Sequence, residues 1–183
     1  MNVAAQSQEA VEAPAEAPTY SIRNTWRGAA ALFFFDAICV GQLSFAVLLF
    51  GWAILVRAPM IVLARKDKPL REFRIKKAAI YLLTAVCIMA VFVFNRNLGT
   101  RHANDLVKAV EAYAARHGQF PQTLEKVVPE FIASIPLARY TLASNEFSYR
   151  TTEDGKHVLS WTVLPPLTRQ HYTFEEKRWI TLD

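Results

Sequence analysis

Asp36 is the residue whose type and position most directly suggest chemistry. It is the single charged side chain in an apolar run of 25 residues, 32–56. Ionisable groups inside a membrane are costly, and they commonly carry protons or bind a polar partner there. Asp36 is therefore a candidate intramembrane polar site. Because it lies within the first turns of the run, its carboxylate could also reach water at the membrane interface.

The histidines form no recognisable catalytic or metal-binding pattern. None of the four lies four residues from another, and no His-Glu-x-x-His motif occurs. The sequence also lacks a Gly-x-Ser-x-Gly motif and a glycine-rich phosphate loop. His117 precedes Gly118 at the end of a helical stripe, where a histidine typically interacts with the helix dipole. We therefore expect a non-enzymatic protein with no catalytic residues, no cofactor and no metal site.

The positive charge is concentrated in one short segment. Residues 57–77 hold eight basic and two acidic side chains, whereas residues 95–183 hold eleven and ten. A nucleic-acid-binding domain needs clustered basic charge on its folded surface, so we expect no nucleic acid partner. The basic segment has two interpretations. It sets the membrane orientation, or it binds anionic lipid headgroups or an acidic cytoplasmic partner.

Two apolar segments predict transmembrane helices, at residues 30–56 and 78–95. About 20 residues of helix cross the hydrocarbon core of a bilayer. The loop 57–77 would stay in the cytoplasm, because Lys and Arg near membrane helices remain on that side. Both termini would then be extracytoplasmic, in a multi-pass protein of the inner (plasma) membrane. Residues 1–29, rich in Ala, Glu and Pro, are expected to be a disordered tail.

Small residues in the first run, Ala37, Gly41 and Ser44, are spaced four and three apart. This spacing places them on one face of a helix, where a second helix can approach closely. They favour a transmembrane helical hairpin, although small residues are common in membrane helices in general.

The C-terminal part, residues 96–183, has the pattern of an α+β domain. Leu106, Val110 and Tyr113 recur at helical spacing and predict an amphipathic helix that continues the second membrane helix. Asp154-Gly155 stands between two alternating stretches, and a second such pair follows, which predicts about four antiparallel strands. We expect the long helix to cover the apolar face of this sheet.

Residues 112–136 read AYAARHGQFPQTLEKVVPEFIASIP. A helix ends in Tyr and Gly, an aromatic-Pro pair and a Leu in a short helix follow, and then come Pro, an aromatic and a closing Pro. This pattern resembles the start of the globular domain of type IV pilins and type II secretion pseudopilins, and the resemblance covers roughly residues 78–183. It implies a long helix packed on an antiparallel sheet. The family's prepilin cleavage motif is missing before Ala78, and no Glu occurs in 78–94, so we do not expect processing or ordinary filament entry.

These observations lead to one functional expectation. The pilin-like periplasmic domain would mediate protein–protein contacts in an envelope assembly of the secretion or pilus type. Its partners would be membrane lipids around the helices and other envelope proteins. The candidate contact surfaces are an exposed sheet edge and the helix face with Leu106, Val110 and Tyr113. Two alternatives stay open: an accessory subunit of an unrelated membrane complex, or a membrane enzyme that uses Asp36 and the histidines.

Overall fold

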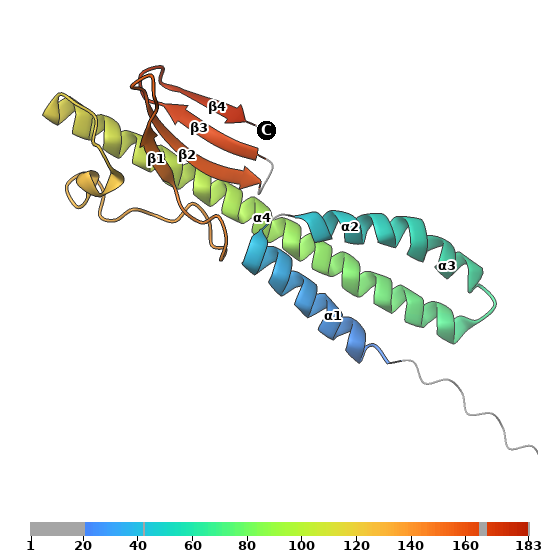
Figure 1. Cartoon of the computed structure of the whole chain (residues 1–183). Helices are drawn as coiled ribbons and strands as arrows, with labels where there is room; N and C mark the ends of the chain where they lie inside the picture. Colours follow the sequence, from blue (N-terminus) through green and yellow to red (C-terminus); the bar gives the residue numbers. More distant parts are fainter. Residues whose placement is uncertain (1–20, 42, 165–167, 183) are drawn as a thin grey trace, which may run out of the picture.

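One helix, α4 (Lys68–His117), runs the length of the molecule (Figure 1). The side chain of Asp67 caps its start by accepting a hydrogen bond of 3.0 Å from a backbone N–H of the first turn. Gly118 ends it in the left-handed conformation, at φ 71°. With 50 residues, α4 is about 75 Å long. The computed structural model describes residues 21–41, 43–164 and 168–182.

The N-terminal apolar run forms two helical legs. The first leg comprises α1 (Arg23–Phe33) and the π-helical η1 (Phe34–Val40). The second leg comprises α2 (Ser44–Trp52), the π-helical η2 (Ala53–Arg57) and α3 (Ala58–Leu63). The prediction of a single helix over 30–56 is therefore wrong. Gly41 and Leu43 both adopt left-handed backbone conformations, at φ 65° and 64°, which end the first leg.

Two other predicted boundaries also change. Residues 57–77, expected as a loop, are mostly helical, and only residues 64–67 connect α3 to α4. Residues 23–29, expected in a tail, belong to α1. Residues 1–20 of that predicted tail lie outside the described residues.

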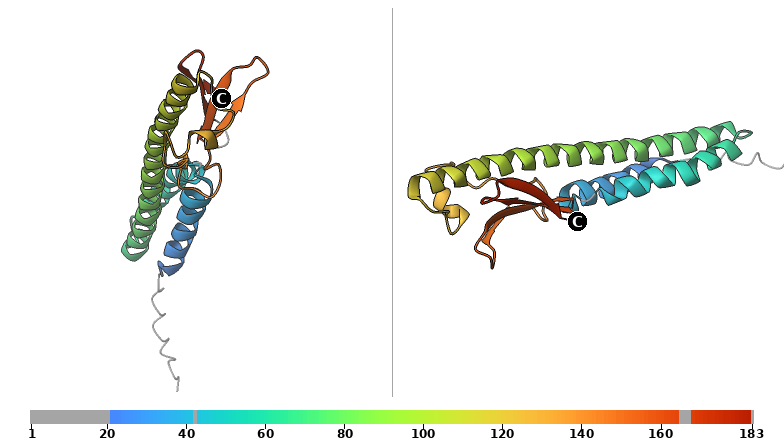
Figure 2. Two further views of the ribbon diagram at one scale, coloured as in Figure 1. Left: turned by 90° about the vertical axis from the view of Figure 1, so that its left-hand side faces the viewer. Right: turned by 90° about the horizontal axis from the view of Figure 1, so that it is seen from above.

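Both legs lie along the N-terminal half of α4 (Figures 1 and 2). The first leg runs in the same direction as α4, because Gly28 lies beside Tyr81 and Ala37 packs with Ile88. The second leg runs in the opposite direction and places Trp52 against Tyr81, with ring centroids 5.5 Å apart. The turn between the legs therefore lies near the middle of α4, beside Val91 and Asn95. The start of α1 points toward the end of the molecule that holds the α3–α4 connection.

Two helices are long and apolar enough to cross a membrane: Ser44–Leu63 and Lys68–His117. Their most apolar windows are only 11% and 33% buried in the structure, whereas the core helix of a soluble protein is mostly buried. Large exposed side chains such as Leu55 and Leu63 contribute to this surface. The described part of the chain thus leaves a broad apolar surface uncovered along these helices.

Among the described residues, four antiparallel strands form a sheet in the order β1-β2-β3-β4. They are β1 (Ser148–Thr151), β2 (His157–Leu164), β3 (Thr168–Thr173) and β4 (Arg178–Leu182). Gly155, at φ 77°, lies in the turn between β1 and β2, where Asp154-Gly155 predicts it. The prediction of an α+β fold, with a long helix packed on a small antiparallel sheet, is confirmed (Figure 1).

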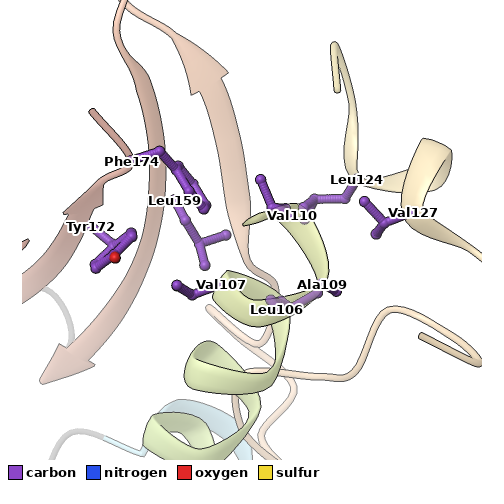
Figure 3. Packing of buried hydrophobic residues seen from close by; sticks show 9 residues of the cluster. All are labelled: Leu106, Val107, Ala109, Val110, Leu124, Val127, Leu159, Tyr172 and Phe174. Carbon is purple, nitrogen blue, oxygen red and sulfur yellow. The ribbon is translucent and has the colours of Figure 1, made fainter. Parts of the chain in front are cut away.

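The helix and the sheet share one hydrophobic core (Figure 3). It contains Leu106, Val107, Ala109 and Val110 from α4, Leu159, Tyr172 and Phe174 from the sheet and the segment after it, and Leu124 and Val127 from the 3-10 helix η3 (Leu124–Val127). Leu106 and Val110 are fully buried, so neither can contact another protein, and Tyr113 packs against the same core. The structure therefore corrects the expectation that this helix face binds a partner, because the domain's own sheet covers it.

Candidate functional site

Asp36 lies at the end of the first leg, beside the turn to the second. Its side chain does not reach an interface from the start of a helix: it is 1% exposed, and the helix already begins at Arg23. Asp36 Oδ2 accepts hydrogen bonds from the N–H groups of Phe45 (3.1 Å) and Ala46 (3.3 Å). These groups belong to the first turn of α2, which has no partners for them within its own helix. Asp36 thus caps α2 from the other leg, where the helix dipole also favours a negative charge.

Residues 137–143, called the docking segment below, join the C-terminal domain to this turn. Leu142 N–H donates to the carbonyl oxygen of Ile38 (2.9 Å), and Ala143 N–H donates to that of Cys39 (3.1 Å). Both carbonyl groups lie in the last turn of η1, where they lack a partner within the helix. The domain therefore caps the end of the first leg, as Asp36 caps the start of the second.

Asn95 and Gly99 bring the docking segment onto α4. Asn95 is 4% exposed, and its Oδ1 accepts a hydrogen bond of 2.8 Å from Tyr140 N–H. A Cβ atom on Gly99 would overlap the carbonyl oxygen of Ala138 and lie 2.5 Å from a ring carbon of Trp161. A residue without a side chain therefore lets the docking segment and β2 approach the helix backbone.

Arg139 is a second buried charge at this junction. It is 1% exposed, and its Nη2 donates a hydrogen bond of 2.5 Å to the carbonyl oxygen of Val163 on β2. Burial lowers the pKa of Arg139 from its usual value, but an arginine still remains protonated at neutral pH. A Cβ on Gly41 would lie 3.4 Å from Arg139 Nη1, which places the guanidinium against the turn between the legs.

Asp36 and Arg139 line one small cavity between the helices and the domain. Its other lining residues are Ala37, Gly41, Leu43, Ile88, Val91, Phe92, Asn95 and Thr141. The cavity measures about 10 Å³, roughly the space of one water molecule, so it is too small for a substrate. Asp36 Oδ1 and Arg139 Nη1 are buried without a hydrogen-bond partner among the described residues. The arrangement therefore couples the turn between the legs to the C-terminal domain.

The histidines do not gather into a site. His102 Nδ1 lies 2.7 Å from the carbonyl oxygen of Leu137, and His157 Nδ1 lies 2.8 Å from Glu175 Oε1. His171 lies apart from both, on β3. In the described ranges, no group of three or more His, Cys, Asp or Glu residues is placed to hold a metal ion.

Sequence reasoning identifies Asp36 but misses the residues that meet it. Of these residues, Gly99 is the one that the sequence itself points to. A glycine inside a helix lowers helix stability by about 1 kcal/mol relative to alanine, so its presence there suggests a close packing contact. Asn95 marks only the end of the apolar stretch. Arg139 carries no signal, because its partner, the Val163 carbonyl group, comes close only in the folded domain.

Comparison of the chain with protein-family models, with curated proteins and with solved structures finds no match. The resemblance to pilins and pseudopilins therefore stays a prediction that rests on residues 112–136.

Proposed function

We propose that this chain is a membrane protein whose three helical segments cross the bilayer side by side. The segments are residues 23–40, 44–63 and 78–94. They are about 25 to 30 Å long, close to the ~30 Å of a bilayer's hydrocarbon core. The uncovered apolar surface of the second leg and of α4 supports this placement. The backbone groups at the turn between the legs are also paired, with Asp36 and with the docking segment, which suits a turn at the edge of the hydrocarbon core, where unpaired groups are costly.

The charges favour one orientation of this bundle. Arg23 and Arg27 lie in the first turns of α1, whose start points toward the end of the molecule that holds the basic connection and the start of α4. Lys and Arg flanking membrane helices remain in the cytoplasm. The N-terminal side of α1 is then cytoplasmic and the C-terminal domain extracytoplasmic. This proposal differs from the sequence-based expectation, in which two crossings leave both termini extracytoplasmic.

Cysteine labelling tests the orientation. In a background with Cys39→Ala and Cys87→Ala, we expect Thr152→Cys to react with a membrane-impermeant maleimide in intact spheroplasts. We expect Ser21→Cys to react only after lysis. Equal labelling of both positions in intact spheroplasts would contradict three crossings.

The function that the geometry supports best is non-enzymatic: the extracytoplasmic domain holds another envelope protein at a fixed distance from the membrane. The carrying observation is the continuity of α4 from Lys68 to His117, which joins the bundle to the domain without a flexible linker. The long helix with its antiparallel sheet also agrees with the pilin-like resemblance, and so favours an assembly of secretion or pilus type. The free edges of β1 and β4 are the contact surfaces that remain, since the apolar face of α4 is covered.

Site-specific photo-crosslinking tests this function. We expect benzoyl-phenylalanine at Ser148 on β1 or Thr181 on β4 to capture an envelope protein, and the same probe at the exposed Lys108 on α4 to serve as a matched control. Pilins, pseudopilins or their membrane platform among the products would support the assembly role. Capture of an unrelated membrane complex would favour the accessory-subunit alternative, and no product from either edge would argue against both.

A further inference from the structure

The outer face of the sheet, turned away from α4, is polar and basic. Side chains alternate along a strand, so Leu159 and Trp161 enter the core while Ser160 and Thr162 point outward. The register places Ser148 of β1 and His171 of β3 on either side of Ser160. The same outward row therefore crosses three strands with short or polar side chains.

A hollow of about 240 Å³ lies over this row. It is lined by Glu146, Ser148, Arg150, Ser160, Trp161, Thr162, Arg169 and His171. The short side chains of Ser160 and Thr162 form its floor, because the longer side chains of Arg150 and Arg169 stand on the neighbouring strands β1 and β3. The sheet thus makes a concave site without help from another element.

The charges at this hollow favour an anion. Within the described residues, the side chains of Arg150 and Arg169 have no ion-pair or hydrogen-bond partner. His171 Nε2 is also buried there without a partner. Burial and the two arginines lower the pKa of His171, so both guanidinium groups lie near its ring. Among the described residues, Glu146 is the single carboxylate that lines the hollow, and it leaves a net positive charge there.

We infer that this hollow binds the carboxylate side chain of an acidic segment of another protein. The inference rests on the proposed function, and it names the chemistry of the partner. Guanidinium groups are flat and carry several N–H donors, which match the two oxygens of a carboxylate. The hydroxyl of Thr162 offers a further hydrogen bond.

The free edge of β1 favours an extended protein segment over a small free anion. A second hollow of about 380 Å³ lies on the other side of β1, beside Thr123 and Glu125, so the strand edge is open from both faces. An added strand can form backbone hydrogen bonds with β1. A residue opposite Arg150 would then share the outer face, where an Asp or Glu pairs with it across the strands.

Peptide binding to the full chain tests the inference. The chain is placed in nanodiscs of neutral lipid, and a fluorescein-labelled hexaglutamate peptide is titrated at low salt by anisotropy. We expect Arg150→Gln/Arg169→Gln to weaken binding at least tenfold, because each lost charge-assisted hydrogen bond weakens binding about tenfold. The control Lys126→Gln/Arg178→Gln removes the same charge from exposed positions outside the hollow, and we expect it to change binding less than twofold.

Two outcomes would overturn the inference. Equal weakening by both double variants would mean that the peptide senses only the net charge. Displacement of the peptide by inorganic phosphate at the peptide's own concentration would make the hollow a free-anion site. If the peptide result fails while the Ser148 and Thr181 crosslinks persist, the proposed function stands and only the acidic partner is lost.

Discussion

Replacing Asp36 by alanine tests whether this carboxylate holds the turn between the two legs. The substitution leaves the N–H groups of Phe45 and Ala46 without acceptors in a buried place. Each buried unsatisfied donor costs about 1–3 kcal/mol. The substitution also removes Asp36 Oδ1, a buried oxygen that has no partner among the described residues. Removing it stabilises the folded chain by roughly 1 kcal/mol. Together these contributions predict that Asp36→Ala lowers the free energy of unfolding by about 1–5 kcal/mol.

The assay is equilibrium unfolding in mixed micelles. Tryptophan fluorescence reports the bundle through Trp26 and Trp52, and the domain through Trp161 and Trp179. Asp36→Asn is the matched control, because its amide oxygen still accepts both N–H groups, and we expect it to lose less than half as much stability. A loss below about 0.5 kcal/mol for Asp36→Ala, the range of ordinary surface changes, would refute the capping role.

Two further predictions concern the domain. Gly99→Ala forces a methyl group against Ala138 and Trp161, so we expect a loss of about 1–3 kcal/mol in thermal unfolding; Gly51→Ala, with open space around it, should not destabilise. The pKa of His171 lies below its ordinary value of 6.5 in the folded domain, so the unfolded chain takes up the proton first as pH falls. Stability should therefore decrease as pH drops through 6.5 and below. The midpoint of thermal unfolding, measured over a series of pH values, should depend less on pH in His171→Gln than in the unmodified chain. The same holds for Arg150→Gln, because Arg150 lowers the pKa of His171.

The C-terminal domain could be predicted well because its signals are local. Leu106, Val110 and Tyr113 mark the buried face of α4 by their spacing alone, and Gly118 marks its end. The prediction failed on what covers that face. Helix periodicity indicates that a face is covered, but not whether the same chain or another protein covers it. The start of β3 carries a weaker signal, because Thr168–His171 shows no apolar alternation on a sheet whose outer face is polar.

The turn between the legs could not be predicted from the same kind of pattern. The run 32–56 is predominantly apolar, and one glycine inside an apolar helix does not end it. What ends it is a set of partners that come from elsewhere: Asp36 supplies the cap of α2, and Leu142 and Ala143 supply donors for the carbonyl groups of η1.

Asp36, the lone charge in the run, nevertheless has a second interpretation that the sequence alone offers. An acidic residue in an apolar segment is stable near water or near backbone N–H groups that need an acceptor. The second case requires a helix start within reach, and a left-handed Gly41 a few residues later provides one at Ser44. A single Asp followed closely by Gly in a long apolar run is therefore as consistent with a turn between two helices as with an Asp at the membrane–water interface. If Asp36→Ala leaves the turn intact, that interpretation fails for this chain as well.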